Sequence, residues 1–358
     1  MAITAWTWKN KNGIIAALAA ATLFGVSTPL AKLLVREITP WMLAGLLYLG
    51  SGLGLALIHL WRLLQPGDQS PECHLRGSDW GWLLGAIAVG GLVAPVLLMF
   101  GLTATSASTA SLLLNLEGMF TALLAWFLFQ EHYDRRIFLG MVAIASGAVL
   151  LVWTGTWSFT TLWGPLAVAG ACLAWGLDNN LSRKVALCDP VQIGMIKGFA
   201  AGTTNLVIAF WQYRSFPDVG IALSAGLLGF LGYGASLVLF IRALRHLGAS
   251  RTGAYFSVAP FVGALVGVIL FWEHISLQLL AGAALMFWGI WLHLTERHEH
   301  DHMHEEVSHE HAHGHGPHHQ HPHDEHCPVC ELHSHWHVHF PLTHSHYHFP
   351  DMHHRHRH

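Results

Sequence analysis

Long apolar runs dominate the sequence, and each is about the length of helix that crosses a lipid bilayer. Only 11% of the 358 residues are charged, against roughly 25% in a typical soluble domain. Because backbone groups in lipid must bond within their own segment, such runs predict helices. Ten runs can be traced, at residues 13–34, 41–61, 80–102, 104–129, 137–153, 163–185, 190–211, 219–243, 248–272 and 275–294. We therefore expect an all-α integral membrane protein with ten spans. The short run at 137–153 and the glycine-interrupted run at 219–243 leave nine or eleven spans as alternatives.

Basic residues in the loops between these runs predict the orientation of the chain. Eleven Lys and Arg residues fall on the side of the amino terminus, and three fall on the other side, at Lys32, Arg36 and Arg214. Since Lys and Arg collect in cytoplasmic loops, both termini are expected in the cytoplasm.

The chain also repeats itself. At an offset of 142 residues, Phe129, Glu131 and His132 recur as Phe271, Glu273 and His274, and Gly140 and Gly147 recur as Gly282 and Gly289. At a slightly larger offset, "LFGVSTPLAK" matches "AWGLDNNLSR", which aligns Gly25 with Gly176 and Lys32 with Arg183; Pro40 and Pro190 then open the next helix. The spacing predicts two five-helix units, residues 1–155 and 156–295, followed by a tail at 296–358.

Five spans is an odd number, so the second unit must enter the membrane from the opposite side. Inverted repeats of this kind build secondary transporters, with a polar site near the midplane between the two halves. The two Glu-His pairs are then symmetry mates on opposite faces, and we interpret them as structural helix ends.

At this point the chain resembles the drug/metabolite transporter superfamily, and most of all its EamA type. The resemblance rests on the five-plus-five layout, the Gly-(x)6-Lys/Arg pattern at Gly25 and Gly176, and the Glu that precedes Gly140 and Gly282 by nine residues. It covers residues 13–294 and implies an inner-membrane carrier of small metabolites, either an exporter or an importer. Gly118 stands where the second repeat has Pro260, which departs from the usual pattern.

Charged side chains within the spans are the candidate transport site, because a charge at membrane depth is costly and usually functional. Glu117 lies in the fourth span, Asp178 in the sixth and Lys197 in the seventh; the repeat replaces Glu117 by Ala259 and Asp178 by Ser27. We expect Glu117 to bind a proton or a cation. The polar residues expected to contact substrate are Asp178, Asn179, Asn180 and Asn115. Lys197 would neutralise a carboxylate or hold an anionic group, and a purely structural pair of Lys197 with Glu117 or Asp178 stays open.

The basic residues Lys32 and Arg183 lie near helix ends, where long basic chains reach toward the interface. We therefore predict that both anchor their helices rather than contact substrate.

The tail has a different composition: residues 296–358 hold 24 of the 30 histidines, with ten acidic residues and three arginines. Without an apolar period it is expected to be disordered and cytoplasmic. Histidine-rich tracts bind divalent metals through neutral imidazole. The candidate ligands are Cys327, Cys330, His333, His335 and His337, a set that suits zinc and is open to nickel, cobalt or copper. Metal binding without any role in transport stays open.

The sequence thus predicts a secondary transporter that is not an enzyme and needs no cofactor. Its expected partners are the lipid bilayer, a small-molecule or metal substrate and a second copy in a homodimer, and nucleic acid is not among them. The spans favour an organic substrate because they hold few metal ligands, whereas the tail favours metal-linked transport. We predict transport linked to a divalent metal through the tail, without naming the ion. The alternative is a membrane-anchored metal sensor or store that does not transport.

Overall fold

The computed structural model describes residues 2–64, 77, 79–129, 135–153, 155, 158–183 and 189–295, and in the tail 301–304, 307–313, 333–339 and 342–345. The chain divides into two compact units, Met1–Glu296 and Arg297–His358, which are described separately.

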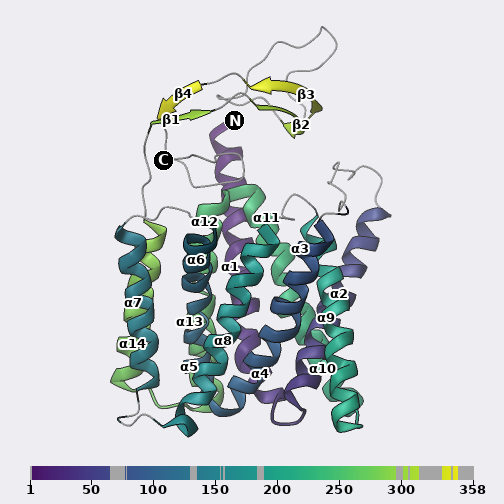
Figure 1. The fold of residues 1–358 in the computed structure, drawn as a ribbon, viewed down its shortest axis with the longest axis vertical. Helices are drawn as coiled ribbons and strands as arrows, with labels where there is room; N and C mark the ends of the chain where they lie inside the picture. The colour runs from purple at the N-terminus through teal and green to yellow at the C-terminus, as the bar shows by residue number, and fades with distance from the viewer. Residues whose placement is uncertain are drawn as a thin grey trace. The chain divides into compact units, whose positions relative to one another are not determined.

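The first unit is a bundle of helices that run between two opposite faces (Figure 1). The first five spans are built from α1 (Ala2–Leu34), α2 (Pro40–Leu63), α3 (Asp79–Ala86), η1 (Ile87–Val93), α4 (Ala94–Ala104), α5 (Ala107–Leu113), α6 (Leu116–Phe129) and α7 (Arg135–Val152). The second five are built from α8 (Phe159–Ser182), α9 (Pro190–Tyr213), α10 (Val219–Gly229), η3 (Phe230–Ala235), α11 (Ser236–Leu247), α12 (Ala249–Phe256), α13 (Ala259–Phe271) and α14 (Leu277–Leu294). We call the upper face in Figure 1, where α12 begins, the α12 face, and the lower one the α5 face.

Ten helices of the described residues are long and apolar enough to cross a membrane, which confirms the predicted number of spans. Four spans are interrupted. The third and the eighth contain the π-helical segments η1 and η3, and the fourth and the ninth are each broken by a two-residue turn, at 114–115 and 257–258. These interruptions occupy equivalent places in the two repeats.

Close contacts between helices also follow the repeat. A Cβ added at Gly140 would meet the carbonyl oxygen of Gly289 at 2.7 Å, and one added at Gly147 would meet that of Gly282 at 2.9 Å. By the 142-residue offset, Gly140 corresponds to Gly282 and Gly289 corresponds to Gly147, so the two contacts are equivalent. The helices α7 and α14 therefore cross on a pseudo-twofold axis. The inverted five-helix repeats are thus visible in the packing, and glycine lets the helices approach closely.

The second helix of each repeat begins in the same way. Thr39 and Asp189 are the N-cap residues, whose side-chain oxygens accept hydrogen bonds from the N–H groups of Met42 and Val191, and proline follows each cap. Proline suits this position because its missing N–H would have no partner in the first turn. The prediction that Pro40 and Pro190 open these helices is confirmed.

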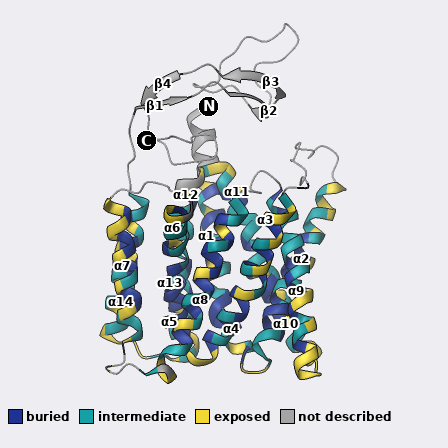
Figure 2. Ribbon diagram, viewed as in Figure 1, coloured by how far each residue is buried: buried dark blue, intermediate teal, exposed yellow. Residues whose placement is uncertain are grey.

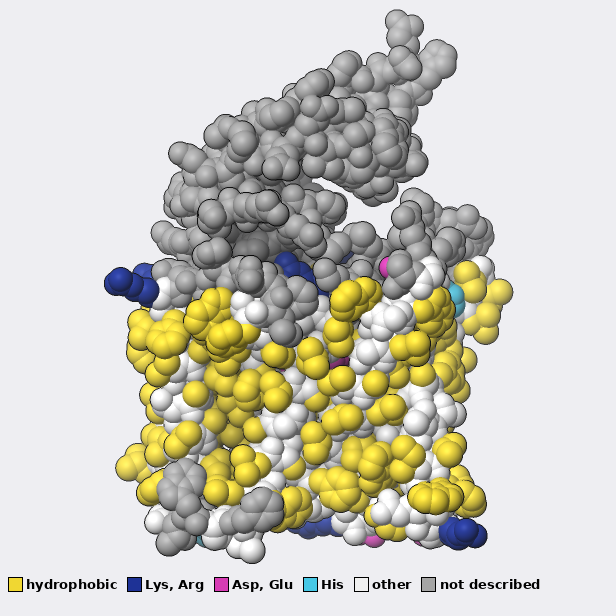
Figure 3. Space-filling view, in the orientation of Figure 1, with side chains coloured by type: hydrophobic (Ala, Val, Ile, Leu, Met, Phe, Trp, Pro, Cys, Tyr) yellow, Lys and Arg dark blue, Asp and Glu magenta, His cyan; other side chains and the backbone are white. Residues whose placement is uncertain are grey.

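The bundle is apolar on both its interior and its flank. Buried residues line the contacts between helices (Figure 2), and apolar side chains cover the visible flank between edges that carry Lys and Arg (Figure 3). Such a surface suits lipid, where the apolar flank needs no water.

In the second unit the structure describes four strands in two antiparallel pairs. β1 (Asp301–His304) pairs with β4 (Leu342–Ser345), and β2 (Val307–His313) pairs with β3 (His333–His339). Isolated two-stranded ribbons are marginally stable in water. The expectation that the tail is largely disordered stays a prediction.

Candidate functional site

An ion pair joins the sixth and seventh spans inside the bundle. Lys197 Nζ lies 2.5 and 2.8 Å from the two carboxylate oxygens of Asp178, and their side chains are only 17% and 10% exposed. Ser182, one turn after Asp178 on α8, donates to the same carboxylate at 2.9 Å and accepts from Lys197 at 3.2 Å. The two opposite charges therefore neutralise each other.

The Asp178 carboxylate rests on the π-helical segment of the third span. A Cβ at Gly90 would collide with this carboxylate, so glycine is required for the approach. The second copy of this contact has the same arrangement, with a hydroxyl in place of the carboxylate: Ser27 of α1 lies against Gly232 of η3. The charge is thus an addition to a shared scaffold.

Proline explains why η1 leaves carbonyl groups free. Pro95 has no N–H, so it cannot serve the carbonyl of Gly91 in an α-helix or that of Gly90 in a π-helix. Side chains supply the missing donors instead. Tyr48 Oη and Trp175 Nε1 donate to the Gly90 carbonyl oxygen at 2.8 and 3.0 Å.

A third donor, Asn205 Nδ2, bonds the Gly91 carbonyl at 3.3 Å. Tyr48 also lies 5.8 Å, between ring centroids, from Tyr233 of η3, its neighbour from the other repeat. Buried polar groups need hydrogen-bond partners. Here the side chains of Tyr48, Trp175 and Asn205 supply those partners to the carbonyl groups of η1.

Glu117 lies just beyond the break in the fourth span, in the first turn of α6. Asn179 Nδ2 donates to its carboxylate at 2.9 Å and also to Thr121 Oγ1 at 3.2 Å, while the Thr121 hydroxyl donates to the Glu117 carbonyl at 2.8 Å. Glu117 is half-buried, Asn179 is exposed, and a Cβ at Gly118 would meet no atom within 4 Å. This polar group is therefore open to its surroundings at mid-span.

The other two predicted asparagines are placed differently. Asn180 is buried and donates to the carbonyls of Gly176 and Thr121, at 2.8 and 3.1 Å, which joins α8 to α6. Asn115 stands in the break itself and donates to the Leu112 carbonyl at 2.8 Å and to Met286 Sδ at 3.7 Å. The structure brings Glu117 and Asn179 together and pairs Asp178 with Lys197, while Asn115 faces α14.

The sequence did not point to several residues of the site, among them Tyr48, Thr121 and Ser182. Ser182 and Thr121 each lie four residues along a helix from a predicted charge, so helical spacing could have found them. Tyr48 is one of many aromatic residues in the apolar runs. Its role depends on the carbonyl group of Gly90, which lies 42 residues further along the chain.

Charged residues at the α5 face bind backbone groups across the repeats. Lys32 Nζ donates to the carbonyls of Leu102 and Thr105 at 2.7 and 2.5 Å, so it turns inward instead of reaching to the interface as predicted. Glu273 accepts from the N–H groups of Ala107 and Ser108 at 2.6 and 3.0 Å. Glu273 is thus a helix-end residue, as predicted, while its mate Glu131 lies outside the described residues.

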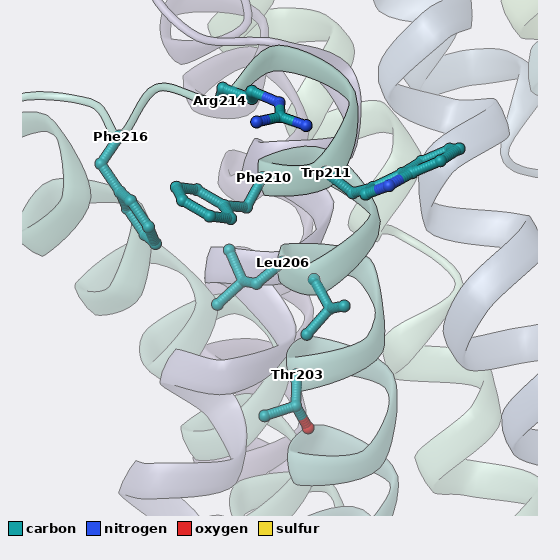
Figure 4. A pocket seen from close by; sticks show the side chains of 7 residues that line it. Thr203, Leu206, Phe210, Trp211, Arg214 and Phe216 are labelled. Atoms are coloured by element: carbon teal, nitrogen blue, oxygen red, sulfur yellow. The ribbon is translucent and has the colours of Figure 1, made fainter.

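A separate groove lies on the flank of α9. Its volume is about 730 Å³, and Figure 4 shows Phe210 turned toward Phe216 while Arg214 lies at the helix end. The lining residues are Thr203, Leu206, Val207, Phe210, Trp211, Arg214 and Phe216. Most of these side chains are apolar and exposed on the lipid-facing side, so the groove suits acyl chains better than a polar solute.

Of the predicted metal ligands, Cys327 and Cys330 lie outside the described residues. His333, His335 and His337 occupy alternate positions of β3, where the register pairs them with His313, His311 and His309 of β2. Among the residues searched in the described part of the chain, no three His, Cys, Asp or Glu gather as a metal cluster.

A ten-span bundle of inverted repeats, with spans broken beside buried charges, has the architecture of a secondary transporter. Comparison with known proteins gives the family: the EamA-like transporter family matches residues 11–153 and 162–295, and the chain belongs to it.

Relatives carry the same broad description. A protein of Methanothermobacter thermautotrophicus called an uncharacterized transporter is 29% identical, over 77% of this chain and 86% of its own length. The uncharacterized transporter YyaM of Bacillus subtilis is 21% identical, over 79% and 93%. A solved structure titled "Crystal structure of protein" covers 79% of this chain and 96% of its own, with 19% identity and a TM-score of 0.56, which supports the fold alone.

Proposed function

We propose that this protein carries small polar organic solutes across the inner membrane by alternating access, with both termini in the cytoplasm. The observation that carries the proposal is the Glu117 carboxylate, which lies at a break in a spanning helix. Within the described residues it has an amide partner, Asn179, and no ion-pair partner.

Exposure of this group at mid-span supports a water-filled access path. Exposing a polar side chain to hydrocarbon without hydrogen-bond partners costs roughly several kcal/mol. Glu117 is half-buried and Asn179 is exposed, so these groups are best satisfied by water or by a solute. Broken helices are tolerated in membranes where they line such a cavity.

The charge balance favours a proton or a cationic group as the partner of Glu117. Asp178 and Lys197 neutralise each other, which leaves the Glu117 carboxylate as the net charge of the site. Asn179 and Thr121 can orient a polar solute beside it, since both are already joined by a hydrogen bond. The second repeat has Ala259 at the position of Glu117, so the scaffold does not need this carboxylate.

The test begins with growth of a deletion strain across a panel of metabolites, drugs and metal salts, to find a transported compound. That compound is then followed into proteoliposomes that contain wild-type protein or the Glu117→Gln variant. We expect the transport rate of the variant to fall by about tenfold or more, while its unfolding midpoint stays the same. Glu37→Gln, which removes an exposed carboxylate at the α5 face, is the matched control. Transport that survives Glu117→Gln would refute the site.

Metal-linked transport is the second candidate, and the histidine tail favours it. We propose that residues 297–358 bind zinc, nickel, cobalt or copper through Cys327, Cys330, His333, His335 and His337 and thereby sense or deliver metal. Calorimetry with full-length and truncated protein tests binding. Uptake or efflux of the metal by vesicles then separates a carrier from a sensor or store, because a sensor binds metal and moves none.

A further inference from the structure

The two faces of the bundle differ at one pair of equivalent contacts. On the α5 face, α13 packs against α5: a Cβ at Gly263 would lie 2.9 Å from Ser111 Oγ, and one at Gly267 would lie 2.9 Å from Ala107 Cβ. We call this contact between α5 and α13 the lower seam. It holds the first half of the broken fourth span against the second half of the broken ninth span.

The mate of this contact is absent on the α12 face. By the repeat, Ser111 and Gly263 correspond to Gly253 of α12 and Thr121 of α6, which define the upper seam. A Cβ at Gly253 would meet no described atom within 4 Å, so Gly253 does not touch Thr121. Instead α6 packs mainly on α8 and α7.

Other equivalent contacts are made in both repeats, which rules out general distortion. A Cβ at Gly25 of α1 would lie 3.2 Å from the Gly263 nitrogen, and one at Gly176 of α8 would lie 2.9 Å from the Thr121 nitrogen. The pairs α1–α13 and α8–α6 therefore keep their geometry, and the asymmetry lies in the halves beyond the breaks. The turns at 114–115 and 257–258 separate those halves.

The lower seam is held by charge. The Glu273 carboxylate follows α13 and accepts from two N–H groups at the start of α5, at 2.6 and 3.0 Å. Such hydrogen bonds to a carboxylate are stronger than those between neutral groups. Yet the seam also buries the hydroxyl of Ser111, which has no hydrogen-bond partner among the described residues. Opening the seam would let water bond that hydroxyl, so the unsatisfied hydroxyl reduces the stability of the closed seam relative to the open one.

We propose that the lower seam is a gate latched by Glu273, and that transport exchanges it for the upper seam. In this structure α5 and α13 are in close contact at the lower seam, whereas Gly253 has no described atom near it at the upper seam. Release of Glu273 frees α5 from α13, and the corresponding closure brings Gly253 onto Thr121. This inference rests on the proposed alternating-access transporter and assigns its gate.

Accessibility of single cysteines tests the gate without any substrate. In a background with the five native cysteines replaced, Ser111→Cys reports on the lower seam and Gly253→Cys on the upper. A membrane-impermeant maleimide is applied to proteoliposomes from each side. We expect Gly253→Cys to react and Ser111→Cys to be protected.

Glu273→Gln should raise labelling at Ser111→Cys about tenfold, because the amide cannot accept from both N–H groups, and lower it at Gly253→Cys. Gly267→Ala, which wedges the seam, should act in the same direction. Glu37→Gln should change neither rate. Unchanged labelling in folded Glu273→Gln and Gly267→Ala, or an equal rise at both cysteines, would overturn the gate. Because no solute is used, a failed Glu117 site and a failed gate give different results.

Discussion

The ion pair between Asp178 and Lys197 allows a quantitative prediction. Replacing Lys197 by Met removes the ammonium 2.5 and 2.8 Å from the carboxylate oxygens and leaves Asp178 in a site where its side chain is 10% exposed. Breaking a buried pair by removing one partner costs about 3–5 kcal/mol. Ser182 still donates to the carboxylate, so we expect the lower end, about 3 kcal/mol.

A double variant separates the pair from its parts. Asp178→Asn with Lys197→Met removes both charges at nearly constant volume, and replacing a buried pair in this way is often neutral. We expect the double variant to unfold within about 1 kcal/mol of the wild type, which gives a coupling energy of about 2 kcal/mol or more. The assay is reversible unfolding by SDS in mixed micelles, followed by tryptophan fluorescence.

Two results would refute this reasoning. One is a Lys197→Met variant as stable as the wild type, and the other is a double variant destabilised by the sum of the single effects. Transport by the stable double variant then decides the remaining alternative. Activity equal to the wild type would make the pair structural, whereas loss of activity would place it in the transport cycle.

Three further predictions use the same unfolding assay. Gly90→Ala should destabilise the bundle by roughly 1–3 kcal/mol, because the added Cβ would collide with the Asp178 carboxylate. Gly253→Ala is the control and should not change stability, because there is open space around its Cβ. Equal effects of the two substitutions would contradict this packing. Lys32→Met should cost roughly 1.5–3 kcal/mol, because two carbonyls at the end of α4 lose their charged donor, and an unchanged midpoint would contradict it. Removing residues 297–358 should leave the midpoint of the helical unit unchanged, since the two units are separate, and a lowered midpoint would contradict it.

Much of the fold could be predicted because hydropathy and internal repetition act over long stretches. The ten spans follow from apolar length, and the inversion follows from five being odd. In the structure, glycines lie at close helix contacts: a Cβ at Gly50 would collide with the backbone of Gly226, and those at Gly263 and Gly267 would meet α1 and α5. Such features need no side-chain detail.

The site was harder to predict because its geometry depends on local departures from the α-helix. Nothing in the run at 80–102 shows that residues 87–93 form a π-helical segment whose Gly90 carbonyl accepts from Tyr48 and Trp175. Likewise, Asn115 and Glu117 are two residues apart, yet the break at 114–115 directs the first to α14 and the second to α8. Charge alone identified Glu117, Asp178 and Lys197, but pairing required the fold.

The most direct measurement follows both seams at once by double electron–electron resonance in lipid nanodiscs. One pair of spin labels, at Thr109 of α5 and Ile269 of α13, spans the lower seam. The second pair, at Arg251 of α12 and Phe127 of α6, is its symmetry mate, offset by 142 residues, and spans the upper seam. We predict that Glu273→Gln lengthens the first distance and shortens the second. Distances that stay fixed, or that lengthen together, would contradict an exchange between two closed faces.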